Sequence, residues 1–243
     1  MWTDKVRQST GKVSKLATHV SINHHALRTL SETFNASEQE QQHPLIPRDD
    51  LVNWVLTIDL INFSFWPDHG KTFEVYYQGQ AYRGYWAMCA LIKLLLDKNI
   101  RITDPREWNE KDKVTKWFLS ITDYIPMLEE RVDILFQAHT ALSQADFDVE
   151  SLLIREDSVN ETLSALINAF ESLRYRSLLI MQRDWCEYRG ERVYFLKRAQ
   201  IMVADWYTML PGRFPKWRMG ELTMFADYRV PAILHSKGTA IVI

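Results

Sequence analysis

The sequence predicts a mainly α-helical protein with small β-hairpins, folded as one domain. Apolar residues recur at three- and four-residue steps over most of the chain, which is the spacing of a helix face. Short alternating runs around glycine-containing turns interrupt this pattern at two places, as hairpins do. No internal repeat or low-complexity segment divides the chain. Its 243 residues, 47% of them hydrophobic, are enough for one substantial core.

Composition excludes several classes of function. The net charge of −2 provides no basic field, so a stable nucleic-acid partner is not expected. Cys89 and Cys186 form no CxxC pair, the histidines form no HExxH motif, and neither GxGxxG nor a P-loop occurs. We therefore expect no metal and no cofactor. Without an apolar signal core or a membrane-length apolar run, the chain is expected to be cytoplasmic, with no membrane partner. A monomer is expected as well.

The first part of the chain is expected to form two helices after a loosely ordered lead-in at residues 1–20. Asn23 is a candidate N-cap for the first helix, and Asp49 or Asp50 can cap the second, which runs to residue 61. An aromatic cluster, Asn62-Phe63-Ser64-Phe65-Trp66, follows. It is either core or the wall of a pocket for a planar ligand.

The middle of the chain combines a hairpin with several helices. Residues 73–85 alternate around Gln78-Gly79-Gln80 and predict the clearest strand pair. Residues 86–100 are apolar on most faces, which indicates a central buried helix. Further helices are expected after Thr103-Asp104-Pro105-Arg106, over 113–142 with a division at Pro126, and over 151–170.

Two stretches in the last third have open interpretations. Arginines and aromatic residues alternate over 171–189, a pattern that suits either single-stranded nucleic acid or an amphipathic surface. Residues 187–195 predict a second hairpin, and 196–209 a helix with Lys197 and Arg198 in its first turn. Cations there oppose the helix macrodipole, so an anionic partner is indicated, either a phosphate or a buried carboxylate; an ordinary surface lysine is the alternative for Lys197.

The most distinctive stretch lies near the C-terminus, at residues 223–231. It places Asp227 between Phe225 and Tyr228 and is followed by Arg229. Aromatic walls can exclude water from a reactive carboxylate and can stack on a flat heterocycle. A structural carboxylate that pairs with Arg229 or caps a helix is the alternative, because such ion pairs also perturb carboxylates.

Several separated stretches together resemble the queuosine salvage proteins, which are queuosine 5′-phosphate N-glycosylase/hydrolases. These stretches occur in the family's order between about residue 20 and residue 234. They are Asn62-Phe63-Ser64-Phe65-Trp66, Tyr82-Arg83-Gly84-Tyr85-Trp86, Leu128-Glu129-Glu130-Arg131, residues 195–205 and residues 224–231.

The resemblance implies a helical bundle related to the helical DNA glycosylases and hydrolysis of the N-glycosidic bond of queuosine 5′-monophosphate. The released queuine, a 7-deazaguanine base, would serve tRNA modification. The resemblance assigns the catalytic carboxylate to Asp227, as nucleophile or transition-state stabiliser, and base contacts to Phe225 and to a histidine best matched by His43. A carboxylate in a dry site offsets the positive charge that develops at the anomeric carbon. Tyr228, Arg229 and Lys197 complete the expected substrate-binding set.

The chain departs from the family pattern after Val230-Pro231. Ala232 stands where the family carries glutamine, and residues 235–243 leave the pattern. The resemblance therefore implies a lead-in (1–20), a C-terminally incomplete queuosine-salvage-like domain (21–234) and a divergent tail (235–243). The part without a match would hold an Asp-Tyr pair and a further Asp that bind ligand. The alternative function is a catalytically impaired form that binds a deazaguanine ligand, or a non-functional isoform.

Overall fold

The computed structural model describes residues 1–33, 50–170 and 185–242, and every structural statement below refers to these residues. Two of the sequence predictions fall elsewhere. His43 lies outside the described residues, as does most of the arginine- and aromatic-rich stretch at 171–189.

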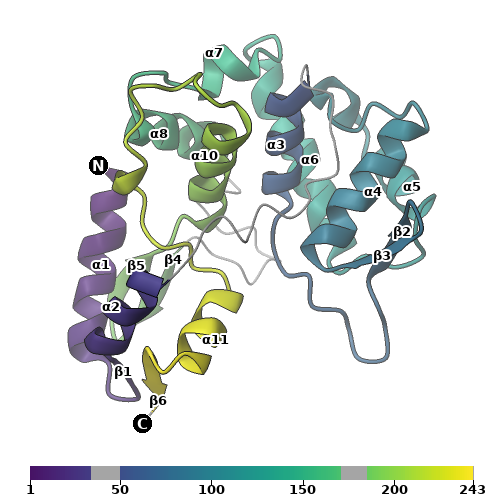
Figure 1. The fold of residues 1–243 in the computed structure, drawn as a ribbon. Helices are drawn as coiled ribbons and strands as arrows, with labels where there is room; N and C mark the ends of the chain where they lie inside the picture. The colour runs from purple at the N-terminus through teal and green to yellow at the C-terminus, as the bar shows by residue number, and fades with distance from the viewer. Residues whose placement is uncertain (34–49, 171–184, 243) are drawn as a thin grey trace.

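The described chain is mainly helical with small antiparallel sheets, as the sequence predicts (Figure 1). The helices differ greatly in length and lie on both sides of the junction between α3 and α10. They are α1 (Trp2–Leu16), α2 (His24–Thr33), α3 (Leu51–Leu60), α4 (Tyr85–Asp97), η3 (Pro105–Asn109), α5 (Lys111–Leu119), α6 (Leu128–Ser143), α7 (Val149–Leu153), α8 (Val159–Ala169), α10 (Lys197–Met209), η4 (Met219–Glu221) and α11 (Arg229–Ser236). The strands are β1 (Val20–Ile22), β2 (Glu74–Tyr77), β3 (Gln80–Arg83), β4 (Trp185–Tyr188), β5 (Glu191–Tyr194) and β6 (Ala240–Val242).

The core centres on α3, which packs against α10 on one side and α6 on the other, while α10 also packs on α8. Trp54, Leu56 and Leu60 of α3 have no exposed surface. The same is true of most of α4, from Ala87 to Ile92, so the prediction of a central buried helix there is confirmed. Burial on all faces explains why these two helices are almost uniformly apolar.

Both predicted hairpins are present. Strands β2 and β3 pair with Val75 opposite Tyr82, and β4 and β5 pair with Cys186 opposite Val193. Each turn has two central residues with positive φ, the second of them glycine: Gly79 in the first and Gly190 in the second. Such turns match the twist of the flanking strands, which is why a glycine in an alternating run is a reliable hairpin signal.

The first twenty residues differ from the expected loosely ordered lead-in. They contain α1, whose Thr3, Val6 and Ser9 are buried. Helix α1 packs on β5 and on α8. Because the buried positions of α1 are mostly small and polar, the helix lacks the apolar stripe by which a docked helix is usually predicted.

The last described residues, expected to be a divergent tail, contain a strand. Strand β6 pairs antiparallel with β1, with Ser21 opposite Ile241, so the last described strand joins the segment that follows α1 in one small sheet. Figure 1 shows this sheet beside α2 and α11 at the lower left. Asn23 caps α2 as predicted, because its side-chain oxygen accepts a hydrogen bond from the amide of Ala26 (3.1 Å). Among the described helices, none combines the length and apolarity needed to span a membrane.

Candidate active site

Asp227 lies in the turn that leads into α11, and both of its carboxylate oxygens have partners. Oδ2 is 2.7 Å from Nζ of Lys197, the first residue of α10. Oδ1 accepts a hydrogen bond from the backbone amide of Arg229 (2.9 Å). The side chain remains 24% exposed, so the carboxylate is held in place and stays partly accessible.

These contacts keep Asp227 ionised. Partial burial by itself raises the pKa of a carboxyl group, but here the hydrogen bonds from Lys197 and from the Arg229 amide outweigh it. The pKa of Asp227 is therefore lowered from its ordinary value. A fixed carboxylate that stays ionised can stabilise positive charge developing on a bound substrate, or can attack it.

Lys197 is not a surface lysine. Only 9% of the residue is exposed, and its ammonium group also donates to the carbonyl of Asn62 (3.2 Å). The neighbouring Arg198 is buried as well and donates to the carbonyl of Leu60 (2.9 Å). Of the two anionic partners that the sequence suggests for these cations, Lys197 therefore has the carboxylate.

The aromatic cluster after α3 is fixed by a buried arginine. Arg131 of α6 has no exposed surface, and its guanidinium donates to the carbonyls of Ile61, Phe63 (2.7 Å) and Ser64 (3.0 Å), as well as to that of Pro126 (2.8 Å). This clamp sets the position of the intervening Asn62 carbonyl, which receives Lys197. The sequence singled out Leu128-Glu129-Glu130-Arg131 as a stretch without indicating this role.

The aromatic cluster itself divides between the two roles that the sequence left open. Phe63 and Phe65 are buried, and both lie against the guanidinium of Arg131, 4.5 and 4.8 Å from it. Trp66 is 78% exposed and lines a groove. Phe65 also lines this groove, so the core interpretation holds for Phe63, the pocket-wall interpretation holds for Trp66, and Phe65 serves both roles.

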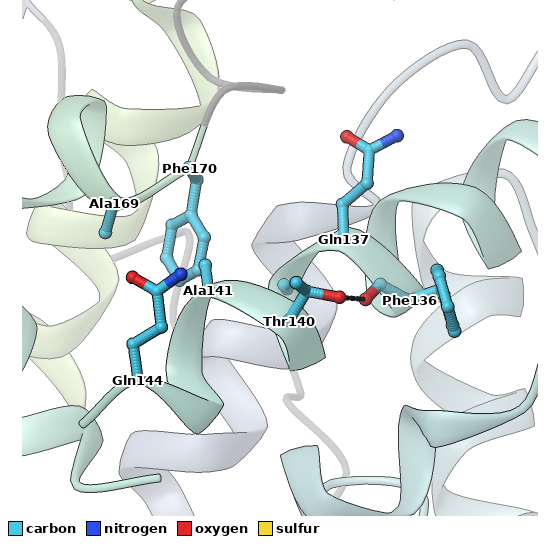
Figure 2. A pocket seen from close by; sticks show the side chains of 8 residues that line it. Phe136, Gln137, Thr140, Ala141, Gln144, Ala169 and Phe170 are labelled. Carbon is cyan, nitrogen blue, oxygen red and sulfur yellow. Dashed lines mark hydrogen bonds between the residues drawn. The ribbon is translucent and has the colours of Figure 1, made fainter. Parts of the chain in front are cut away.

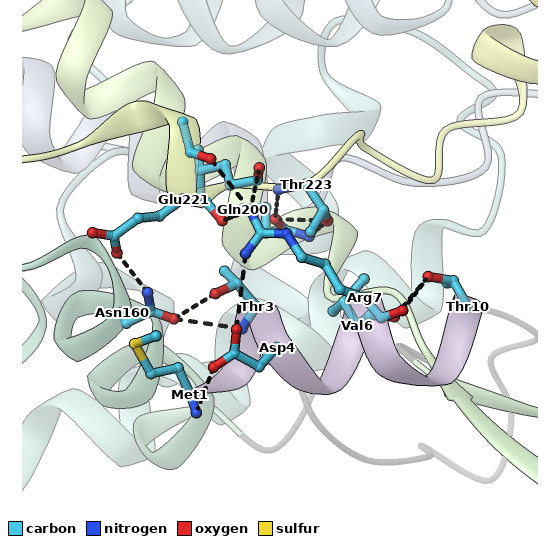
Figure 3. Close-up of polar contacts among 12 residues, drawn as sticks. Met1, Thr3, Asp4, Val6, Arg7, Thr10, Asn160, Gln200, Glu221 and Thr223 are labelled. Atoms are coloured by element: carbon cyan, nitrogen blue, oxygen red, sulfur yellow. Dashed lines mark hydrogen bonds and ion pairs between the residues drawn. The ribbon is translucent and has the colours of Figure 1, made fainter. Parts of the chain in front are cut away.

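The segment before Asp227 is anchored to α10 and α1. The amide of Thr223 donates to Oε1 of Gln200 in α10 (2.8 Å). Further back, Glu221 accepts a hydrogen bond from Asn160 of α8 (2.6 Å), and its carbonyl accepts one from Arg7 of α1 (2.7 Å). Figure 3 shows α1 reaching this segment through Arg7 and, by way of Asn160, through Thr3. The helix that the sequence did not predict thus supports the site.

The other predicted site residues lie around Asp227 in different settings. Phe225 is half-buried, and its carbonyl accepts the amide of Asp227 (2.8 Å). Tyr228 is 46% exposed, and both it and Arg229 line the groove that holds Trp66. The structure thus brings Asp227, Lys197, Phe225, Tyr228 and Arg229 together, whereas the position of His43 is not described.

Two further carboxylates, neither predicted as a site residue, interact with each other, and one of them, Asp59, also interacts with Lys197. Asp59 of α3 is fully buried, and its Oδ2 has no hydrogen-bond partner among the described residues; Oδ1 accepts from Asn62 (3.2 Å). Burial and the nearby charge of Asp205 raise the pKa of Asp59 well above its ordinary value. Burial raises the pKa of Asp205 to about 6. A single acidic residue inside the apolar run of residues 54–61 was the available signal.

A second pocket, of about 280 Å³, lies along α6 and the end of α8 (Figure 2). Amide, hydroxyl and aromatic side chains line it, including Gln137, Thr140 and Phe170, and none of its described lining residues is ionisable. It lacks the charged groups that glycosidic-bond chemistry requires.

Within the described residues, no cluster of three or more His, Cys, Asp or Glu side chains could hold a metal ion.

The fold and site define a mainly helical protein in which one carboxylate, that of Asp227, is held beside a buried ammonium group, that of Lys197. A family model described as queuosine salvage protein matches residues 42–241. The chain therefore belongs to the queuosine salvage protein family.

Relatives in distant organisms share most of this chain, and each of them is named queuosine 5′-phosphate N-glycosylase/hydrolase. The relative from Sphaerobacter thermophilus is 33% identical over 96% of this chain and 72% of its own length. The relative from Schizosaccharomyces pombe is 30% identical over 97% of this chain and 70% of its own. The mouse relative is 30% identical over 94% of this chain and 70% of its own length.

Proposed function

We propose that the chain hydrolyses the N-glycosidic bond of queuosine 5′-monophosphate, releasing queuine and ribose 5-phosphate. The observation that carries this proposal is that Asp227 is held at both carboxylate oxygens, which keeps an ionised and partly exposed carboxylate in one orientation. The name of the relatives supplies the substrate class. We also propose that the fold is related to that of the helical DNA glycosylases. The chain would act as a monomer and without a cofactor.

The chemistry follows from the charge that develops as the base leaves. Breaking the bond between the base nitrogen and the anomeric carbon gives that carbon oxocarbenium character. Asp227 either stabilises this charge or bonds to the carbon until water displaces it. In both cases the base departs with the bonding electron pair and gains a proton, and the sugar gains a hydroxyl from water.

The surroundings of Asp227 assist in two ways. The ammonium group of Lys197 prevents Asp227 from taking up a proton and so keeps the negative charge available. The half-buried ring of Phe225 and the exposed ring of Tyr228 offer apolar faces to a flat heterocycle. The expected contact between His43 and the queuine base rests on the family resemblance alone.

The test is release of queuine from queuosine 5′-monophosphate by the purified chain, followed by chromatography. Asp227→Asn keeps the shape and the hydrogen-bonding oxygen but removes the charge, and we expect its kcat to fall by about a hundredfold or more. Asp146→Asn is the matched control, because Asp146 is exposed and its positive φ suits asparagine. Unchanged turnover by a folded Asp227→Asn would rule out the catalytic assignment.

A protein that binds the ligand without cleaving it gives a different result. The wild type would then show a ligand-dependent rise in Tm and no released base. Measuring both quantities in one incubation therefore separates hydrolysis from binding alone.

A further inference from the structure

A groove of about 560 Å³ opens beside Asp227, where α11 meets the first hairpin and the loop after α3. Besides Phe65, Phe73 and two other apolar residues, its lining includes two cations, a tryptophan, a tyrosine, a threonine and a glycine. These residues are Trp66, Thr72, Arg83, Gly84, Tyr228 and Arg229, and we call the site the Arg83–Arg229 groove.

Arg229 supplies an uncommitted guanidinium. The residue is exposed, and its side chain forms no hydrogen bond or ion pair with the described residues. One terminal nitrogen of Arg229 lies 3.9 Å from the place that a Cβ atom on Gly84 would occupy. Gly84 has positive φ and no side chain, so the guanidinium of Arg229 faces bare backbone at this point. It can therefore donate hydrogen bonds to a ligand in the groove.

Arg83 adds a second cation, partly compensated by one carboxylate. Its Nε is 2.5 Å from Oε2 of Glu74, which leaves the rest of a 75% exposed side chain facing solvent. The lining itself contains two guanidiniums and no carboxylate, whereas Glu74 pairs with Arg83 and Asp227 interacts with Arg229 from outside the lining. Guanidinium groups fit phosphate oxygens in a two-bond geometry, so the ligand that this pair suits is a phosphate ester.

The other cations near Asp227 are not available for this role. Lys197 is bound to Asp227 itself and to the carbonyl of Asn62. Arg198 is buried and donates to a backbone carbonyl of α3. Among these four cations, only Arg83 and Arg229 line the groove.

The groove adjoins the candidate catalytic carboxylate through Tyr228 and Arg229, which line it and directly follow Asp227 in the chain. The backbone amide of Arg229 holds Asp227, while the side chain of the same residue lines the groove. We propose that the Arg83–Arg229 groove binds the 5′-phosphate of the nucleotide substrate and so favours the 5′-monophosphate over the free nucleoside. This inference rests on the proposed function for the identity of the nucleotide, but the phosphate site can be tested without it.

Binding is tested first, with inorganic phosphate as the probe. Phosphorus NMR or a thermal shift, titrated with orthophosphate at constant ionic strength, is compared for the wild type, Arg229→Gln and Arg83→Gln. We expect Arg229→Gln to weaken phosphate binding by about tenfold or more, the effect of a lost charge-assisted hydrogen bond. Arg218→Gln is the control, because Arg218 is exposed and lies outside the groove lining.

Cleavage then shows what the groove discriminates. We compare kcat/KM for queuosine 5′-monophosphate with kcat/KM for queuosine. The ratio should fall by about tenfold or more in Arg229→Gln, mainly through KM, and should not change in Arg218→Gln. An equal loss on both substrates, or phosphate binding that does not depend on Arg229, overturns the phosphate site. The wild type could instead bind phosphate in a way that depends on Arg229 but release no queuine. That result supports the phosphate site and overturns the proposed function.

Discussion

Nζ of Lys197 lies 2.7 Å from Oδ2 of Asp227, and this pair joins the first residue of α10 to the turn before α11. The lysine side chain is 11% exposed and the carboxylate 24%, so water screens the pair only partly. A cation in the first turn of a helix is unfavourable by itself. The carboxylate offsets that cost, and in return the lysine keeps Asp227 charged.

Removing the ammonium group should therefore destabilise the protein and shift the titration of Asp227. Since the folded-state pKa of Asp227 is depressed, its contribution to the free energy of unfolding is present above the unfolded pKa. It is lost as the pH falls through the folded pKa. We expect Lys197→Met to cost about 1–3 kcal/mol at pH 7 and less at pH 3, as measured by urea unfolding.

A matched lysine tests whether the effect belongs to this site. Lys216 pairs with Asp157, but both side chains are more than two-thirds exposed. Lys216→Met should therefore change the free energy of unfolding by less than about 1 kcal/mol. Equal losses in the two variants would show that the Lys197–Asp227 pair behaves as an ordinary surface pair.

The partly buried Asp205 predicts a second pH effect, of opposite sign. Burial raises the pKa of Asp205 to about 6, so this group favours the folded state fully only below its unfolded pKa of about 3.9. That contribution is lost as the pH rises through the folded pKa. Asp205→Asn should remove this slope, so the difference between variant and wild type should move in the variant's favour by up to about 2–3 kcal/mol from pH 4 to pH 8.

Other titratable groups interact with Asp205, and they come from α3 and α4. Their own titration must be considered when the pH dependence of the Asp205→Asn variant is interpreted. Asp59 of α3 is close enough to interact with it, and so are Tyr85 and Cys89 of α4. Tyr85 and Cys89 have raised pKa values caused mainly by burial, so they stay neutral from pH 4 to pH 8. Asp146→Asn should keep the wild-type slope. A slope unchanged by Asp205→Asn would contradict the prediction.

Arg131 predicts a large effect on stability that does not involve Asp227 directly. Its guanidinium is the partner of four backbone carbonyls. Arg131→Met would leave these buried acceptors without their donor, and we expect a loss of about 3–5 kcal/mol in chemical denaturation. Arg131→Lys keeps the charge but cannot reach all four acceptors, so an intermediate loss is expected. Equal stability of Arg131→Met and the wild type would exclude the clamp.

Much of the fold was predictable because its signals are local. Apolar spacing predicts α3 and α4, and a glycine in an alternating run predicts each hairpin. Asn23 shows the same for helix caps, since the residue type and its position before an apolar pattern were sufficient. These features depend on residues only a few positions apart.

The parts that were missed depend on distant partners. Helix α1 buries Thr3 and Ser9, whose hydrogen bonds reach Asn160 and the amide of Tyr194. No periodicity within α1 reveals such partners. Likewise, Lys197 could be recognised as a cation in need of an anion, but the choice between phosphate and carboxylate depended on where Asp227 lies in space.

The last prediction tests the docking of α1, on which the segment before Asp227 depends. Thr3 is fully buried, and its hydroxyl donates to Oδ1 of Asn160 (2.9 Å), whose amide holds Glu221. Thr3→Val keeps the shape of the side chain but removes this donor, so we expect a loss of about 1–2 kcal/mol in urea unfolding. Thr10→Val is the control, because the hydroxyl of Thr10 bonds only to carbonyls within α1. The docked arrangement of α1 would be contradicted if the two valine variants were equally stable, because of these two hydroxyls only that of Thr3 bonds to a described residue outside α1.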